Sequence, residues 1–418
     1  MKSNLLLVFV LIGCSVQSTA QSPDAEAWRR DLEAYRSGLE KNHIDLYHSI
    51  DAQDFNRDLE RQIANAANLS KAQRWVELMR LTRRVGDGHT AIPLWVQAKQ
   101  IFPLVTTVVG DAVLVTGVRA QDKQLLGGII QSVNRVPIAE VLAGLSQIVP
   151  FVENEYSERV RVGDYFPFED LLVGLGFTTP GAATQFNILV KDDVRSLELT
   201  AVTREEVFEI ITDRITPLHP EPFFTAQENE AIWYDLNRDQ DTVYIRFDAY
   251  PSAKKMEAFA DRLLRRINNA AVANIIIDLR ENYGGDFYNG LILASRLNLV
   301  DSISWLDGVY VLIGPRTFSA AMSNAIQFKE VLNAKLVGSP TGGNPCGYQD
   351  MGQFSLPASS LLVTYSKRRF CFVETSAGFV APDVYVETPI SDYLDGQDSV
   401  LAWVMDDIER RAKTREAP

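Results

Sequence analysis

The spacing of apolar residues predicts helices in the first fifth of the chain. From Ala25 to about Gly86, apolar positions such as Trp28 and Leu32 recur every three or four residues. This spacing predicts three amphipathic helices. Ser70 followed by Gln73 predicts a capping box at the start of the third helix, because each can hydrogen-bond the other's backbone N–H.

The apolar pattern changes twice after this helical region. Between Ile101 and Val202 it consists of short β-branched runs separated by turns, which predicts a small β-rich domain. From Glu221 to Ile408 strand patterns alternate with helical ones. The strands are expected at Thr242–Phe247, Asn274–Leu279 and Val309–Ile313, and the helices at Ala253–Asn268 and Ala320–Leu332. The chain is therefore predicted to be a multidomain α/β protein.

The first 20 residues have the pattern of an export signal. Lys2 precedes the apolar run Leu5–Ile12, which is too short to span a bilayer. Two processing sites fit: cleavage after Ala20, or a lipoprotein-type site that would leave Cys14 as an N-terminal lipid anchor. Either implies export to the periplasm or the extracellular space. An oxidising compartment would permit a disulfide between Cys346 and Cys371, and two buried free thiols are the alternative.

Charge and composition exclude several classes of function. Lys and Arg number 41 and Asp and Glu 54, so the 418-residue chain has a net charge of −13, the wrong sign for binding nucleic acid. After the signal, no stretch approaches the ~20 apolar residues of a membrane span. The 4 histidines are too scattered along the sequence to predict a zinc site, and no phosphate-binding loop occurs, so we expect no metal or cofactor.

One histidine lies in a glycine-rich turn. Gly86–Thr90 reads Gly-Asp-Gly-His-Thr and presents His89 after a predicted helix. A lone histidine in a loop is more often solvated or packed than catalytic. His43 and His48 lie in the helical region and are expected to be structural, and His219 lies in an apparent linker.

Two further segments have the character of active-site loops. Ile275–Gly285 is an apolar strand followed by Gly284 and Gly285, where backbone N–H groups can approach a ligand without a Cβ in the way. A purely structural turn is the alternative. Val309–Met322 predicts a strand, a tight turn and a helix whose first turn holds Ser319. Simple N-capping by a hydroxyl is the alternative there.

Together these motifs resemble a known superfamily. Gly-Asp-Gly-His-Thr, Asp-Leu-Arg-x-Asn-x-Gly-Gly, Thr-Phe-Ser-Ala-Ala and Val337–Gly343, in this order, resemble the carboxy-terminal-processing and tricorn-like serine peptidases. The resemblance implies a helical N-terminal cap carrying the histidine loop at 24–97 and a PDZ-like module at 98–205. It implies an α/β catalytic domain related to the ClpP and crotonase folds at 221–410.

The resemblance also implies roles for site residues. The Ser-Lys branch has its catalytic lysine directly after the turn that ends at Gly343, where this chain has Asn344. The tricorn-like, Ser-His branch is therefore favoured, with Ser319 as nucleophile and His89 as general base. The backbone N–H groups of Ala320 and of Gly284 or Gly285 would form the oxyanion hole.

The third catalytic group is where the sequence departs from the family. Tricorn-like enzymes have a serine immediately before the histidine and a glutamate near the chain end, whereas this chain has Gly88 before His89. Glu374 is the nearest counterpart of that glutamate, and Asp87 is another candidate to orient the histidine.

The expected function is that of an exported, tail-specific serine endopeptidase that cleaves unfolded or C-terminal segments of proteins. Two alternatives remain open. One is a noncatalytic protein of the same fold that binds peptides or hydrophobic ligands. The other is a hydrolase of nonpeptide esters or amides, because a fold and a nucleophile do not specify the substrate.

Overall fold

A computed structural model describes residues 23–215, 223, 230–237, 239, 241–270, 272–374 and 377–416. The predicted export signal, Cys14 and His219 lie outside these residues. In the described part of the chain, no helix is both long enough and apolar enough to cross a membrane.

The N-terminal region folds into the three helices predicted from the apolar spacing. They are α1 (Pro23–Asn42), α2 (Ala52–Asn65) and α3 (Lys71–Arg83). Ser70 and Gln73 form the predicted capping box at the start of α3. Trp28 and Leu32 are buried in the core that these helices share with the β-rich region.

The β-rich region forms a sheet with strand order β2-β3-β4-β6-β7, with β5 added to β4 and β9 to β3. Its strands are β2 (Val105–Val109), β3 (Ala112–Arg119), β4 (Ile129–Val133), β5 (Val136–Pro137), β6 (Thr184–Val190), β7 (Asp193–Leu199) and β9 (Ile211–Arg214). β1 (Gln100–Ile101) pairs separately with β8 (Val202–Thr203). The helices are η1 (Ala120–Leu125), α4 (Ile138–Ser146), α5 (Glu155–Tyr165), α6 (Glu169–Gly174) and α7 (Arg204–Ile210).

The C-terminal region is built on a sheet of order β10-β11-β12-β13-β14-β17. Its strands are β10 (Ile232–Leu236), β11 (Thr242–Phe247), β12 (Asn274–Asp278), β13 (Val309–Ile313), β14 (Lys335–Gly338) and β17 (Val384–Tyr385). All neighbours pair in parallel except β10 with β11. The helices are α8 (Ala253–Ala270), α9 (Phe287–Leu297), α10 (Ala320–Leu332), α11 (Ile390–Leu394) and α12 (Ser399–Glu416).

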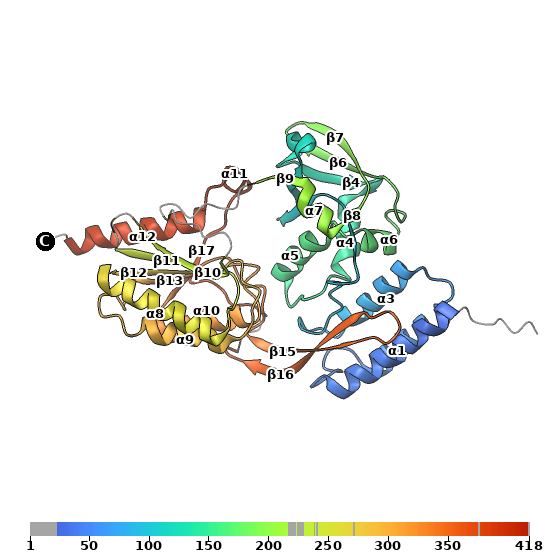
Figure 1. Cartoon of the computed structure of the whole chain (residues 1–418), viewed down its shortest axis with the longest axis horizontal. Helices are drawn as coiled ribbons and strands as arrows, with labels where there is room; N and C mark the ends of the chain where they lie inside the picture. Colours follow the sequence, from blue (N-terminus) through green and yellow to red (C-terminus); the bar gives the residue numbers. More distant parts are fainter. Residues whose placement is uncertain are drawn as a thin grey trace, which may run out of the picture.

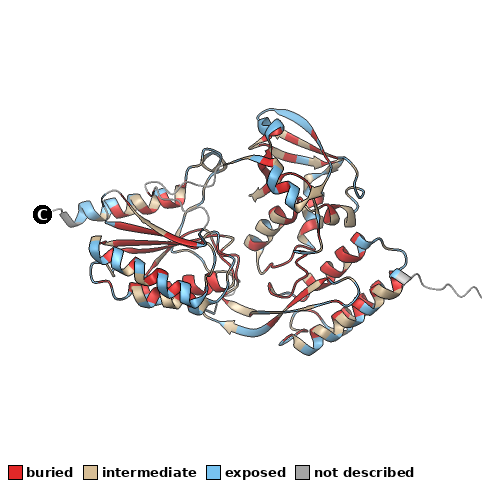
Figure 2. Ribbon diagram, viewed as in Figure 1, coloured by how far each residue is buried: buried red, intermediate tan, exposed pale blue. Residues whose placement is uncertain are grey.

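Helices cover both faces of this sheet, which explains why its central strands β12 and β13 are buried throughout and mostly apolar. Ile275 and Ile277 of β12 pack with α8, α9 and α10, whereas Ile276 faces the cluster that includes α12. The colouring of Figure 2 shows β12 and β13 buried along their whole length. The predicted α/β sheet is confirmed.

A long hairpin joins the C-terminal region to the N-terminal helices. β15 (Cys346–Ser355) pairs with β16 (Leu362–Cys371), and the hairpin extends from the C-terminal region to lie alongside α1 (Figure 1). The Cys346–Cys371 disulfide closes its base, which confirms the pairing that an oxidising compartment would permit. Near its tip, the backbone N–H groups of Ala358 and Ser359 donate to the buried Asp31 of α1.

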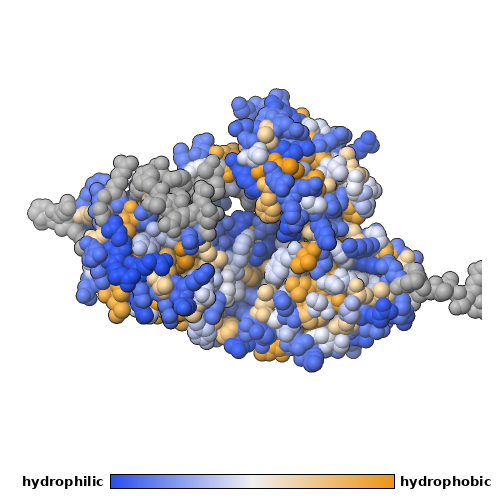
Figure 3. Space-filling view, viewed as in Figure 1, coloured by the Kyte–Doolittle hydropathy of each residue, from blue (hydrophilic) through white to orange (hydrophobic). Residues whose placement is uncertain are grey.

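The surface seen in Figure 3 is mostly hydrophilic, with apolar residues scattered among polar ones. The three regions meet in the middle of the molecule, where loops from each of them converge (Figure 1).

Candidate active site

Ser319 lies at the sharp turn between strand β13 and helix α10. Its backbone has φ 51° and ψ −122°, a strained conformation for a residue with a side chain. Thr317 fixes the turn, because its hydroxyl donates to Leu279 O and accepts from Gly314 N–H. Among the described residues, the Ser319 side chain makes no capping hydrogen bond to α10. The capping alternative therefore does not account for this serine.

His89 reaches Ser319 from the turn that follows α3. Its Nε2 lies 2.9 Å from Ser319 Oγ, although the two residues are 230 positions apart in the chain. The imidazole is 6% exposed, and the ring of Phe318 stacks on it with 5.5 Å between centroids. A nucleophile and a general base in this arrangement can exchange a proton directly.

Glu153 lies at the other nitrogen of the same imidazole. Its Oε1 is 3.3 Å from His89 Nδ1, and its side chain is 5% exposed. This is ion-pair distance, but within the described structure the two atoms are not aligned as a hydrogen bond. Glu153 also accepts a hydrogen bond from Asn344 N–H, which fixes the carboxylate against the turn beside Ser319.

Among the described residues, neither of the two carboxylates suggested by the sequence pairs with the His89 imidazole. Glu374 is exposed, and no hydrogen bond or ion pair joins it to His89 in the part of the chain that the structure describes. Asp87 Oδ1 accepts hydrogen bonds from the backbone N–H groups of His89 and Thr90, at 3.0 and 2.8 Å. Asp87 therefore contacts the backbone of the histidine turn rather than the imidazole.

The position of Glu153 explains why Gly88 departs from the family pattern. A Cβ atom at residue 88 would lie 2.4 Å from Glu153 Cγ and 2.7 Å from Phe318 Cζ. The space that a serine side chain would need before the histidine is thus filled by the Glu153 side chain. Sequence reasoning missed Glu153, because it lies in the β-rich region and belongs to no recognised motif. Its only local signal is the capping box of Asn154 and Ser157 at the start of α5.

The loop predicted to form the oxyanion hole passes directly beside Ser319. A Cβ at Gly284 would lie 2.7 Å from Ser319 Cβ and 3.0 Å from Ala320 N, so only glycine fits there. The φ of Gly284 is +109°, which also favours glycine. Its own N–H donates to Asn282 Oδ1 at 2.9 Å. Ala320 begins α10, and the first N–H groups of a helix have no acceptor within that helix.

The turn that ends at Gly343 packs against the same serine. A Cβ at Gly343 would lie 3.1 Å from Ser319 N. The Asn154 side-chain amide donates to Thr341 O, Gly342 O and Gly378 O, which joins the start of α5 to this turn. Lys329 and Lys335 are paired with Asp383 and Asp407 respectively, so neither is available as a base near Ser319.

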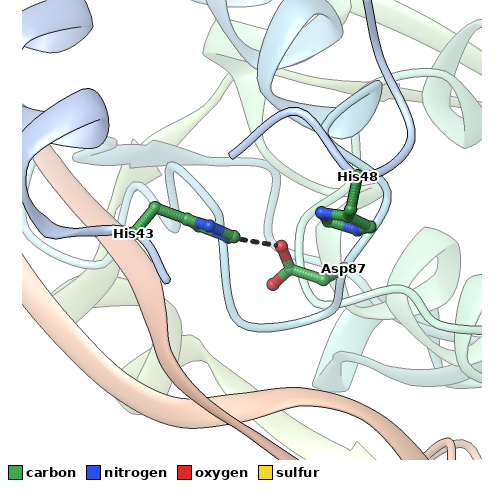
Figure 4. Close-up of side chains that lie close together, drawn as sticks. All are labelled: His43, His48 and Asp87. Carbon is green, nitrogen blue, oxygen red and sulfur yellow. Dashed lines mark hydrogen bonds and ion pairs between the residues drawn. The ribbon is translucent and has the colours of Figure 1, made fainter. Parts of the chain in front are cut away.

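His43, His48 and Asp87 come together close to the histidine turn (Figure 4). Their potential ligand atoms all lie within 4.8 Å of one another, a proximity that the sequence did not predict. The hydrogen bonds argue against metal binding. Asp45 N–H donates to His43 Nδ1, so in neutral His43 the proton is on Nε2, where it points at Asp87 Oδ2. A metal ion would need the lone pair of that same nitrogen.

Comparison with solved structures shows a known fold. The structure of mature CPAF complexed with lactacystin matches over 93% of this chain and 98% of its own, with 12% identity and a TM-score of 0.63. A CPAF mutant matches over 92% and 96%, with 14% identity and a TM-score of 0.60. The chain has the fold of CPAF.

The match to the CPAF fold covers nearly the full length of both chains, from the N-terminal helices to the C-terminal sheet. The resemblance seen in the motifs is therefore confirmed at the level of the fold. The photosystem II D1 C-terminal processing protease also matches, over 90% of this chain and 98% of its own, with 15% identity and a TM-score of 0.43. No protein-family model matches this chain, and no curated protein matches it in sequence.

Proposed function

We propose that this chain is a serine endopeptidase of the tail-specific and tricorn-like superfamily, with Ser319, His89 and Glu153 as its catalytic triad. The contact between His89 Nε2 and Ser319 Oγ carries the proposal. It joins two segments that are far apart in the sequence, at a strained serine on a helix N-terminus, and a purely structural role would not require that combination.

In the proposed reaction, Ser319 Oγ attacks a peptide carbonyl while His89 Nε2 takes its proton. The Glu153 carboxylate stabilises the positive charge that develops on the imidazole. His89 then returns the proton to the leaving amine. A water molecule activated in the same way hydrolyses the acyl-enzyme and regenerates Ser319.

The oxyanion of the tetrahedral intermediate would be bound by backbone N–H groups. Ala320 is one proposed donor, because its N–H lies at the start of α10, where the helix dipole also stabilises negative charge. Of the two predicted glycines, Gly285 is the better second donor, because the N–H of Gly284 already donates to Asn282.

The substrate and the cellular location are proposed from the motifs, the disulfide and the apolar run near the N-terminus. We propose unfolded or C-terminal protein segments as substrates, since the motifs resemble those of tail-specific peptidases. The β-rich region is proposed to be the PDZ-like module of that superfamily, and the N-terminal helices its cap. The Cys346–Cys371 disulfide and the apolar run near the N-terminus support export, with or without a lipid anchor at Cys14.

Labelling with a fluorophosphonate and digestion of a peptide library test this proposal together. Wild type should be labelled and should cleave peptides, while Ser319→Ala and His89→Ala should do neither. Ser323→Ala is the matched control, because this buried serine lies one turn further along α10. Labelling that persists in Ser319→Ala would refute the nucleophile assignment. Labelling of wild type without peptide cleavage would favour a nonpeptide ester or amide hydrolase.

A further inference from the structure

Asp87 is a buried carboxylate, and both of its oxygens accept hydrogen bonds from other groups of the protein. Its side chain is 3% exposed. Oδ1 accepts hydrogen bonds from the N–H groups of His89 and Thr90 and from the Ser366 hydroxyl, and Oδ2 accepts one from His43 Nε2. Burial raises the pKa of Asp87, but the hydrogen bonds from His43 and Ser366 outweigh it and lower the pKa to about 2.

The partners of Asp87 come from three separate segments. His89 and Thr90 belong to the histidine turn, His43 follows α1, and Ser366 lies on β16 of the hairpin. Ser366 is also tied to the N-terminal helices, because its carbonyl accepts from Ile44 N–H at 3.1 Å. Asp87 is therefore the point at which the C-terminal hairpin and the N-terminal helices both hold the turn that carries His89.

His43 can act in this arrangement in only one neutral form. The Asp45 N–H, 2.9 Å from Nδ1, keeps that nitrogen unprotonated, so Nε2 carries the proton and donates it to Asp87 at 3.0 Å. The His43 side chain is fully buried. Figure 4 shows its ring directed at the Asp87 carboxylate. His48 lies on the other side of Asp87 but engages Asp45 O through Nδ1.

We propose that Asp87 is a positioning residue for the general base His89, and that His43 and Ser366 lock Asp87 in place. The proposal rests on the proposed peptidase function. Asp87 does not touch the reacting atoms. It fixes the backbone of the turn, and hence the distance from His89 Nε2 to Ser319 Oγ.

This proposal predicts a particular pattern of kinetic effects. Asp87→Asn keeps an oxygen that can accept from the His89 and Thr90 N–H groups, but it places an amide N–H₂ against the Nε2–H of His43. Two donors would then face each other, and His43 cannot change tautomer because of Asp45 N–H. We expect kcat to fall by about 10- to 100-fold with KM within about twofold, because misplacing a catalytic group impairs the reaction more than binding.

The double-mutant cycle isolates the link between His43 and Asp87. In a His43→Leu background the opposing donor is absent. The fold-decrease in kcat caused by Asp87→Asn should therefore be at least about fivefold smaller in that background than in wild type. His43→Gln retains a donor for Asp87 and should keep more activity than His43→Leu. His48→Ala is the matched control and should keep kcat close to that of wild type.

Cleavage of a fluorogenic peptide, with circular dichroism to confirm folding, distinguishes the outcomes. Independent effects of the His43 and Asp87 substitutions on kcat would overturn the proposal, as would folded Asp87→Asn and Ser366→Ala variants with full kcat. If His48→Ala matched His43→Leu and EDTA inactivated wild type, the cluster would be a metal site instead. A wild type that neither cleaves peptides nor reacts with fluorophosphonate would refute the peptidase function itself.

Discussion

Replacing Glu153 by Gln tests the assignment of the third catalytic group. The substitution keeps the size of the side chain and leaves an oxygen to accept from Asn344 N–H. It removes the negative charge beside His89 Nδ1. It also introduces an N–H₂ group that can donate to Nδ1 and so favour the tautomer with a proton on Nε2, which cannot accept the proton of Ser319.

The size of the effect follows from the geometry. Both side chains are almost fully buried, and Glu153 Oε1 lies 3.3 Å from Nδ1. With an effective dielectric constant of ~20, a carboxylate and an imidazolium at that distance attract each other by about 5 kcal/mol. Since about 1.4 kcal/mol corresponds to a tenfold change in rate, kcat should fall by roughly 10³- to 10⁴-fold.

The assay is the steady-state cleavage of a fluorogenic peptide by wild type, Glu153→Gln and Glu374→Gln. KM should change little in Glu153→Gln, because the charge acts mainly in the transition state. Glu374 is exposed, so Glu374→Gln should behave like wild type. A Glu153→Gln variant within threefold of wild type would refute the role of Glu153. A loss of activity in Glu374→Gln would make Glu374 the third catalytic group instead.

Three further predictions concern the surroundings of the triad. Gly88→Ala should lower kcat by at least about 100-fold in a folded protein, because the new methyl group would displace Glu153; unchanged activity would show that this carboxylate is not needed where it lies. Asp278→Ala should destabilise the protein by about 3–5 kcal/mol in urea unfolding, because this buried carboxylate pairs with Arg246 and Arg280 and accepts from the buried Tyr244 hydroxyl. Arg280 would keep only Asp398, and a loss under 1 kcal/mol would contradict this prediction. The pKa of Asp87 is about 2 in the folded protein, against 3.8 ordinarily, which corresponds to about 2 kcal/mol of the free energy of unfolding. This contribution is present above pH 3.8 and is lost as the pH falls through 2. Unfolding of Asp87→Asn should lack that part of the acid dependence.

The helices and strands could be predicted largely from apolar periodicity, because periodicity is a local property of the sequence. The helices near the N-terminus and the buried strands β12 and β13 follow directly from apolar spacing. The contact between Ser319 and His89 required a family resemblance, since nothing local relates residues 230 positions apart.

Glu153 and the contacts of Asp87 could not be predicted in this way. Glu153 reaches His89 only because α5 docks on the turn at Thr341–Asn344, and that docking depends on tertiary packing. The same holds for His43, whose position in the helical region suggested packing alone. Gly88 indicates that another side chain packs closely against the histidine turn, because a Cβ at residue 88 would collide with Glu153. A glycine alone does not identify which side chain that is.

The central claim is that Ser319 is a nucleophile activated by His89, and locating a covalent adduct tests it most directly. After reaction with a fluorophosphonate, tryptic digestion releases Thr317–Lys329, which contains Ser319 and Ser323. Fragmentation by mass spectrometry should place the adduct on Ser319 in wild type, and no adduct should form in His89→Ala. An adduct on Ser323 or outside this peptide, or equal labelling of Ser319 without His89, would contradict the account.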